Sequence, residues 1–300
     1  MDYEYNLQVD GDNHLYVRIY KNEKLNNNQK TNVLYVVHGL NEHSGRYEFL
    51  KETGADFDYI VFYDHIGHGK SSGKRAYIKH FSGFSIHLMQ VIRFSQNELA
   101  ARFGVTKGGI NNHIFGHSMG GMISLDFLDD NADKDKGYNI KIGSAIISAP
   151  FIDPVLKNTK DKIDNFLGSF LYSTFKSLGG VSIKKDLAYY ISKDEKEVNA
   201  YRKDELNSDK ITFALFFSQK EVRDKFLCSE KKHNHPILFL SPQEDFLSEP
   251  KSVGKAFEKL NCENKKIIKY DKSYHESFRC VEKDLVFRNI KSFWVKVIKK

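Results

Sequence analysis

The sequence predicts an α/β fold, in which helices flank a mainly parallel sheet. Short apolar runs rich in β-branched and aromatic residues recur along the first half of the chain, and longer stretches with helical spacing separate them. Strands that alternate with helices in this way form βαβ units, whose strands pair in parallel. The expected strands of the first half are residues 15–20, 33–37, 59–63, 113–115 and 144–148.

Helices are expected between these strands and in the last third of the chain. Residues 84–103 have the clearest helical spacing of apolar side chains. Two further strands, at 237–240 and 266–270, lie on either side of a helix near 252–259, and another helix follows at 285–298. The sheet is therefore expected to resume late in the sequence.

A long segment separates the two groups of strands. More than eighty residues lie between Ser148 and Ile237, and they are rich in Phe, Tyr, Leu and Lys with the spacing of several short helices. A connection of that length inside a compact domain usually has a function, often as a lid. We therefore expect a single domain over residues 1–300, with a helical cap inserted at approximately 151–235.

Composition limits the class of protein. Hydrophobic residues make up 40% of the 300 residues and charged residues 28%, which is typical of a soluble globular protein. No apolar run approaches the roughly 18 residues of a membrane span, and the acidic first five residues do not resemble a secretory signal. The three cysteines, Cys228, Cys262 and Cys280, lack C-x-x-C spacing, which favours free thiols over disulfides or a zinc site. We expect a cytoplasmic protein that holds no metal.

The net charge of +7 is concentrated near one end of the sequence. Residues 282–300 carry six Lys or Arg and two Asp or Glu, a balance of +4. Elsewhere lysines and acids alternate, as on a solvated surface. Because the chain has no arginine-rich stripe and no basic-aromatic platform, the sequence argues against nucleic-acid binding.

One short motif points to covalent chemistry. Ser118 stands in GHSMG (residues 116–120), a G-x-S-x-G pattern, directly after an expected strand and before a helical run at 119–128. This is the context of a nucleophile elbow, in which a strained turn presents a serine hydroxyl. We therefore expect Ser118 to be a nucleophile.

A serine hydroxyl needs a general base, and the base needs a third group that orients it. The order along the chain in folds that carry this elbow is serine, then acid, then histidine. Asp245 and His275 follow in that order, and each comes just beyond an expected strand. Glu244 is the alternative for the acid, and Asp271 is less favoured because it lies nearer to the end of its strand.

An oxyanion formed on the substrate needs two backbone N–H donors. We expect one from Met119, the residue after the nucleophile. The other should come from the loop that follows the strand at 33–37, where Leu40 is the candidate. At both positions the backbone donates, so the identity of the side chain matters less.

Longer motifs surround these residues. They are HGLNEHSGRY, YDHIGHGKSSGKRAYI, GHSMGG, ISKDEKEVNAYRKDEL, SPQEDFLSEP and YHE, and they lie between about Val33 and His275. Together they resemble the monoacylglycerol lipase and lysophospholipase group of α/β-hydrolases. The resemblance implies the α/β-hydrolase fold with an inserted helical cap.

The resemblance also implies roles for particular residues. Ser118, Asp245 and His275 would form the catalytic triad. The oxyanion donors would be the N–H groups of Leu40 and Met119. The polar head of the substrate would lie near Glu42, Arg46 and Tyr201.

We expect a carboxylic ester hydrolase that acts on lipids with one acyl chain, monoacylglycerol or lysophospholipid, through an acyl-enzyme and without a cofactor. The alternatives are a short-chain carboxylesterase, a peptidase on the same fold, or a non-catalytic ligand-binding protein. The aromatic stretches 166–175 and 213–217 predict an acyl tunnel beneath the cap. Lysines beside them, as in FLYSTFK, suggest weak peripheral contact of the cap with membranes.

Overall fold

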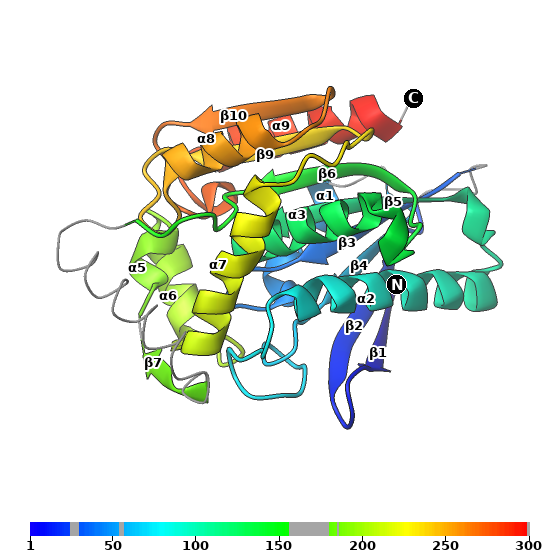
Figure 1. The fold of residues 1–300 in the computed structure, drawn as a ribbon, viewed down its shortest axis with the longest axis horizontal. Coiled ribbons are helices and arrows are strands. Elements are labelled where there is room, and N and C mark those ends of the chain that lie inside the picture. The colour runs from blue at the N-terminus through cyan, green and yellow to red at the C-terminus, as the bar shows by residue number, and fades with distance from the viewer. Residues whose placement is uncertain (25–29, 54–56, 156–179, 185, 299–300) are drawn as a thin grey trace.

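A mainly parallel sheet forms the centre of the computed structural model, which describes residues 1–24, 30–53, 57–155, 180–184 and 186–298 (Figure 1). In these residues eight strands follow the order β1-β2-β4-β3-β5-β6-β9-β10. β2 pairs antiparallel with β1 and β4, and the other pairings of this sheet are parallel. The strands are β1 (Asp2–Gln8), β2 (His14–Lys21), β3 (Thr31–Val37), β4 (Tyr59–Tyr63), β5 (Ile110–His117), β6 (Ile142–Ser148), β9 (Ile237–Pro242) and β10 (Lys265–Tyr270). The predicted sheet is confirmed.

The edge strand β1 was not predicted from the sequence. Its residues alternate between exposed polar side chains and half-buried Tyr3, Tyr5 and Leu7. Tyr5 packs edge to face against Phe94, and Tyr3 packs in the same way against Phe103. Apolar and polar side chains therefore do alternate along β1 with a period of two. Because every second side chain is polar, the strand is less hydrophobic than the buried strands, which are apolar throughout.

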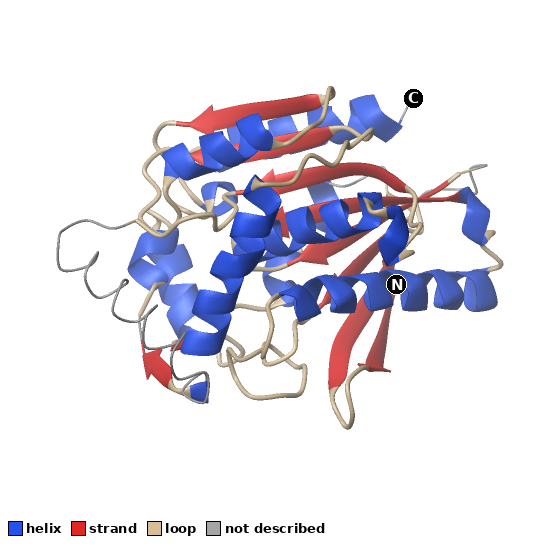
Figure 2. Ribbon diagram, in the orientation of Figure 1, coloured by secondary structure: helices blue, strands red, loops and turns tan. Residues whose placement is uncertain are grey.

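Helices cover both faces of the sheet (Figure 2). One face carries α2, α3 and α8, and the other carries α1 and α9 (Figure 1). Four of them start and end within a few residues of the predicted helices. The bounds are α1 (Leu50–Thr53), α2 (Ser82–Phe103), α3 (Met119–Ala132), α8 (Pro250–Lys259) and α9 (Lys283–Ile298), with short 3-10 turns at Ser44–Tyr47, Lys107–Gly109, Lys134–Lys136 and Ser277–Arg279.

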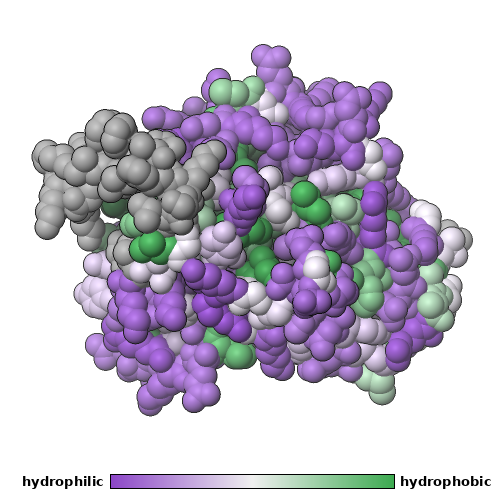
Figure 3. Space-filling model, turned by 60° about the horizontal axis from the view of Figure 1, so that its bottom comes forward, coloured by the Kyte–Doolittle hydropathy of each residue, from purple (hydrophilic) through white to green (hydrophobic). Residues whose placement is uncertain are grey.

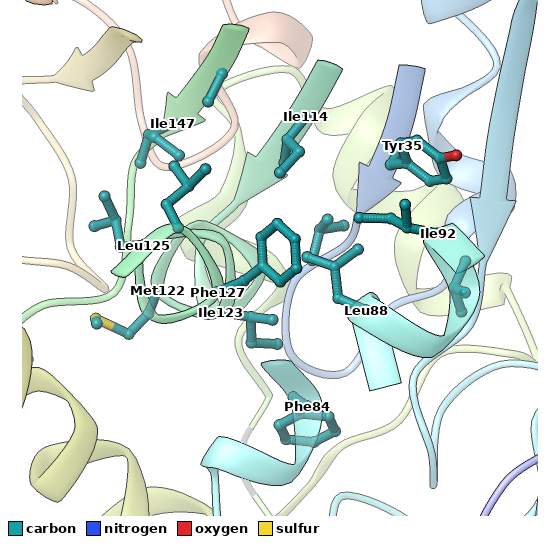
Figure 4. Packing of buried hydrophobic residues seen from close by; sticks show 14 of the residues in the cluster. Tyr35, Phe84, Leu88, Ile92, Ile114, Met122, Ile123, Leu125, Phe127 and Ile147 are labelled. Atoms are coloured by element: carbon teal, nitrogen blue, oxygen red, sulfur yellow. The ribbon is translucent and has the colours of Figure 1, made fainter. Parts of the chain in front are cut away.

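The packing of α2 and α3 on the sheet fixes the position of the nucleophile. Figure 4 shows side chains of both helices meeting those of β3, β5 and β6 in one apolar layer. Each large apolar side chain buried there stabilises the fold by about 1.5–3 kcal/mol. Because α3 begins directly after Ser118, this layer holds the serine against the end of β5. The labelled residues are Tyr35, Phe84, Leu88, Ile92, Ile114, Met122, Ile123, Leu125, Phe127 and Ile147.

The described part of the segment between β6 and β9 lies beside the carboxyl ends of the strands (Figure 1). Its helix α7 is tied to α3, since the Lys225 ammonium lies 2.7 Å from carboxylate oxygens of both Asp126 and Asp130. The expected aromatic stretch at 166–175 and the whole of FLYSTFK (residues 170–176) lie outside the described residues. The described elements of the segment are β7 (Ser182–Lys184), α5 (Ala188–Ile191), α6 (Glu195–Lys203), β8 (Lys210–Thr212) and α7 (Phe213–Leu227), with β7 and β8 paired antiparallel.

Candidate active site

Four loops meet at the carboxyl ends of the parallel strands. Ser118 follows β5, Asp245 follows β9 and His275 follows β10. Leu40 lies in the loop after β3, the neighbour of β5 in the sheet. Parallel strands end at one edge, so residues more than 200 positions apart in the sequence are brought to one place.

The backbone at Ser118 is strained in the way that the GHSMG motif predicts. Ser118 has φ 54° and ψ −118°, a conformation that L-residues rarely adopt. A side chain on Gly120 would bring its Cβ within 2.0 Å of the Val37 carbonyl oxygen, and one on Gly116 within 2.3 Å of the Ser124 hydroxyl. Gly116 therefore lets α3 lie close to β5, and Gly120 lets α3 lie close to the end of β3, so both glycines are required at this turn.

Two hydrogen bonds connect the side chain of His275 to those of Ser118 and Asp245. His275 Nε2 lies 2.7 Å from Ser118 Oγ, and His275 Nδ1 lies 2.6 Å from Asp245 Oδ2. The second oxygen of Asp245 accepts the backbone N–H groups of Leu247 and Ser248 at 2.7 and 3.0 Å. All three side chains are buried. This is the geometry of a nucleophile, a general base and an orienting carboxylate.

Glu244 and Asp271, the two other acids considered from the sequence, do not contact His275. The Glu244 carboxylate is 2.7 Å from the Lys193 ammonium and is 44% exposed. Asp271 is also exposed. Of these three acids, Asp245 is the one that contacts His275.

Charges around His275 favour its protonated form. Burial lowers the pKa of the imidazole, but the Asp245 carboxylate, and after it Glu276 and Glu42, raise it, so the pKa of His275 lies above its ordinary value. The ring of His117 is 4.9 Å away, and burial together with His275 lowers the pKa of His117 well below its usual range. His117 is therefore neutral at neutral pH and adds no positive charge beside the imidazolium.

The candidate oxyanion donors line the same cavity as Ser118 and His275. Met119 is the first residue of α3, so its N–H is one of those that have no acceptor within the helix. The positive end of the helix dipole lies at the same point. Leu40 lines the cavity from the loop after β3. Both backbone segments are therefore beside the serine.

The turn after β4 holds the loop after β3 in place. Asp64 accepts the backbone N–H and the hydroxyl of Ser44 at 2.8 and 2.7 Å. The N–H of His65 donates to His38 Nε2 at 3.0 Å. These contacts give the segment DHIGHGKSSG (residues 64–73) a structural role, because they hold the loop after β3 in place.

A cavity of about 930 Å³, counting its opening to solvent, lies above Ser118. Its wall is mainly aromatic and aliphatic, with polar groups gathered next to His275. Its apolar part is lined by Phe81, Phe151, Pro154, Val155, Leu187, Ile191, Ile211, Leu215, Phe216, Phe246 and Leu247. Among the described residues, no His, Cys, Asp or Glu side chains gather in a group that could hold a metal ion.

The three residues that the resemblance assigned to the substrate lie together. Glu42 and Tyr201 line the cavity, and Arg46 binds Glu42 at 2.7 Å. A fourth charged or polar residue of this group, Glu276, was not predicted from the sequence. It also lines the cavity and binds Arg46. Its place directly after His275 was the signal that could have identified it.

The profile of the family described as serine aminopeptidase, S33, matches residues 28–284, most of the chain. The chain belongs to this family. Its fold is the α/β-hydrolase fold, and the resemblance noted in the sequence is confirmed. Rat monoglyceride lipase is 26% identical over 247 residues, which cover 81% of this chain and 75% of the rat protein.

Other similar proteins differ in length or in organism. An uncharacterized abhydrolase domain-containing protein of Dictyostelium discoideum is 29% identical over 245 residues, but this chain spans only 24% of its length. The structure of a Paleococcus ferrophilus monoacylglycerol lipase matches with a TM-score of 0.74 at 24% identity, over 94% of this chain and 98% of that one. A Saccharomyces cerevisiae monoglyceride lipase, solved with a substrate analog, matches with a TM-score of 0.79 at 18% identity, over 99% and 95%. At these identities the structural likeness supports the shared fold.

Proposed function

We propose that this chain, a carboxylic ester hydrolase by its family and relatives, cleaves lipids with a single acyl chain, monoacylglycerols or lysophospholipids. The observation that carries the proposal is the hydrogen-bonded series Ser118–His275–Asp245 at the base of an apolar cavity. The names of the relatives add support, since they include monoglyceride lipases and a Bacillus subtilis phospholipase.

The proposed reaction begins with acylation of Ser118. His275 Nε2 takes the proton of the hydroxyl while Oγ attacks the ester carbonyl carbon. The N–H groups of Leu40 and Met119 donate to the resulting oxyanion. The C–O bond to the alcohol then breaks, and His275 returns the proton to the leaving oxygen.

Hydrolysis of the acyl-enzyme completes the cycle. His275 takes a proton from a water molecule, which attacks the acyl carbon, and Ser118 leaves with that proton as the fatty acid is released. Asp245 stays ionised and stabilises the imidazolium in both half-reactions. No cofactor enters any step.

The two ends of the cavity support a division between acyl chain and head group. The apolar wall suits the acyl chain. Glu42, Arg46 and Tyr201 keep their proposed place beside the polar head, because Glu42 and Tyr201 line the polar end and Arg46 binds Glu42.

Activity should rise with acyl length up to a medium or long chain. Each CH₂ that enters the apolar part of the cavity contributes up to about 0.8 kcal/mol, so several more carbons should raise kcat/KM many-fold. The measurement is the hydrolysis rate of 4-nitrophenyl esters and of glycerol and phosphocholine esters of increasing acyl length. An optimum at acetate or butyrate would indicate the short-chain carboxylesterase, and faster hydrolysis of aminoacyl anilides would indicate the peptidase.

We also propose weak peripheral membrane contact through the cap, at residues 151–235. Its described part exposes Val181 and Tyr189 at 46% and 63%, with exposed Lys196 and Lys203 on α6. Figure 3 shows apolar side chains gathered near the middle of one face, with polar and charged residues around them. No helix in the described part of the chain has the length and hydrophobicity needed to cross a membrane.

Binding to anionic vesicles should be weak and should depend on salt. Each basic residue near such a surface contributes about 1 kcal/mol, and raising the salt from about 0.1 M to 1 M shortens the Debye length from about 10 Å to 3 Å. In sedimentation we expect partial binding at low salt, less at high salt, and less with Tyr189→Ala than with the control Ile86→Ala on α2. Protein that stays wholly in the supernatant at low salt would contradict the proposal.

A further inference from the structure

A buried group of charged side chains lies between two of the loops that form the site. Arg46 donates through Nη1 to Glu42 Oε2 at 2.7 Å and to Glu276 Oε1 at 2.7 Å, and through Nη2 to Glu276 Oε2 at 2.8 Å. The exposed fractions of these residues are 3% for Glu42, 8% for Arg46 and 2% for Glu276. Removing one partner from a buried set of this kind leaves the others uncompensated, so the three act together.

Each carboxylate reaches a different part of the candidate active site. Glu42 Oε1 accepts the N–H of Gly39 at 2.6 Å, next to the candidate oxyanion donor Leu40, and it also accepts the hydroxyl of Tyr47 at 2.7 Å. A Cβ on Gly39 would lie 2.6 Å from the same oxygen and 3.2 Å from the Cβ of Ser118. The Gly39 backbone is thus enclosed between the Glu42 carboxylate and the nucleophile.

Glu276 connects the same group to the general base. It is the residue after His275, and its own N–H donates to the carbonyl of Ile191 in α5 at 2.8 Å. Both ends of Glu276 are therefore fixed, its backbone by α5 and its carboxylate by Arg46. The adjacent imidazole is held relative to the loop after β3.

Resting on the proposed function, we infer that Glu42, Arg46 and Glu276 form a brace, meaning a buried group of charges that fixes one loop relative to another. This brace holds the Gly39–Leu40 backbone and His275 in position relative to Ser118. They are positioning residues: the hydrogen bonds of Glu42 and Arg46 go to other groups of the protein. This role goes beyond the proposed contact with the head group of the substrate. A displacement of a reacting group by about 1 Å can lower the rate of such a reaction by about 100-fold, so holding these groups in position should raise kcat.

The variants Glu42→Gln and Glu276→Gln test the brace at constant side-chain shape. A glutamine at 42 places an NH₂ against either the Gly39 N–H or the Arg46 guanidinium, and a glutamine at 276 places one against Arg46. With a soluble 4-nitrophenyl ester, whose leaving group carries no polar head, we expect each variant to lower kcat by about 10- to 100-fold while KM changes little. Unchanged kcat with this ester, together with a larger KM for the glycerol ester of the same fatty acid, would instead indicate a contact with the head group and would overturn the proposal.

The pH profile gives a readout that loss of stability alone would not move. The groups facing His275 are the carboxylates of Asp245, Glu276 and Glu42 and the ring of His117. Because a carboxylate near His275 raises the pKa of its imidazole, Glu276→Gln should move the acid limb of kcat/KM to lower pH. The control Asp129→Asn removes a buried carboxylate that lies 3.0 Å from His233 near the far end of α3, so it should lower Tm without moving that limb. An unmoved limb in Glu276→Gln would contradict the brace.

The double variant tests whether the two carboxylates act through one guanidinium. If they do, Glu42→Gln combined with Glu276→Gln should lower kcat by at most about 3-fold more than the worse single variant. Multiplied effects would mean two independent contacts and would overturn the brace. Wild-type protein that hydrolyses no ester would count against the proposed function, whereas active wild-type protein with fully active single variants would count against the brace alone.

Discussion

Replacing Ser118 with alanine is expected to abolish ester hydrolysis while the fold stays intact. The hydroxyl is the atom that His275 contacts at 2.7 Å, and no other hydroxyl is hydrogen-bonded to that imidazole among the described residues. Loss of the nucleophile in a serine triad lowers kcat by about 10⁴- to 10⁶-fold. The substitution removes one oxygen and keeps Cβ, so Tm should change by no more than about 3 °C.

A neighbouring serine on α3 provides the matched control. Ser124 is fully buried, and its hydroxyl donates to the Gly120 carbonyl at 2.7 Å, away from His275. A fluorophosphonate probe should label wild-type protein and Ser124→Ala but not Ser118→Ala. Labelling or turnover that survives in Ser118→Ala would rule out this serine as the nucleophile.

The order of the elements could be predicted because both periodicities were visible in the sequence. Buried strands such as β4, in which all five residues are buried, read as continuous apolar runs. The helix α2 has apolar spacing over most of its length. β1 was missed because half of its side chains are exposed and polar. The pattern of apolar residues predicts an element best when that element is deeply buried. An edge strand such as β1 is only partly buried, so its pattern is weaker.

The candidate triad could also be chosen from the sequence, because each of its residues follows a strand whose carboxyl end lies at one edge of the sheet. The choice between Asp245 and Glu244 could not be made from spacing alone. It depends on which carboxylate the turn after β9 directs inward, and that turn is formed by the hydrogen bonds from Leu247 and Ser248 to Asp245.

The contact between Arg46 and Glu276 could not be predicted from the sequence, for a different reason. Glu42 and Arg46 are four positions apart, but Glu276 is 230 positions from Arg46. A contact between side chains on two separate loops depends on the tertiary fold, and the sequence carries no periodic signal for it. The adjacency of Glu276 to His275 indicates that it lies near the site but does not identify its partner.

Replacing Asp245 with asparagine is expected to lower kcat by about 10⁴-fold. In the structure Asp245 Oδ1 accepts two backbone N–H groups, so the amide oxygen of an asparagine must take that position. Its NH₂ group then faces His275 Nδ1, where the carboxylate oxygen lies at 2.6 Å in the wild type. Such a donor favours the tautomer that carries its proton on Nε2, and His275 in that form cannot accept the proton of Ser118.

The matched variant is Glu244→Gln, one residue earlier in the same loop. It removes a carboxylate from the partly exposed contact with Lys193, a pair of the kind that contributes at most about 1 kcal/mol to stability, so its kcat should stay within about 2-fold of wild type. The two variants should also differ in their pH profiles. The Asp245 carboxylate raises the pKa of His275, so the residual activity of Asp245→Asn should persist to lower pH than that of the wild type, whereas Glu244→Gln should keep the wild-type limb. Equal losses of kcat in the two variants would mean that the contact between Asp245 and His275 does not orient the general base.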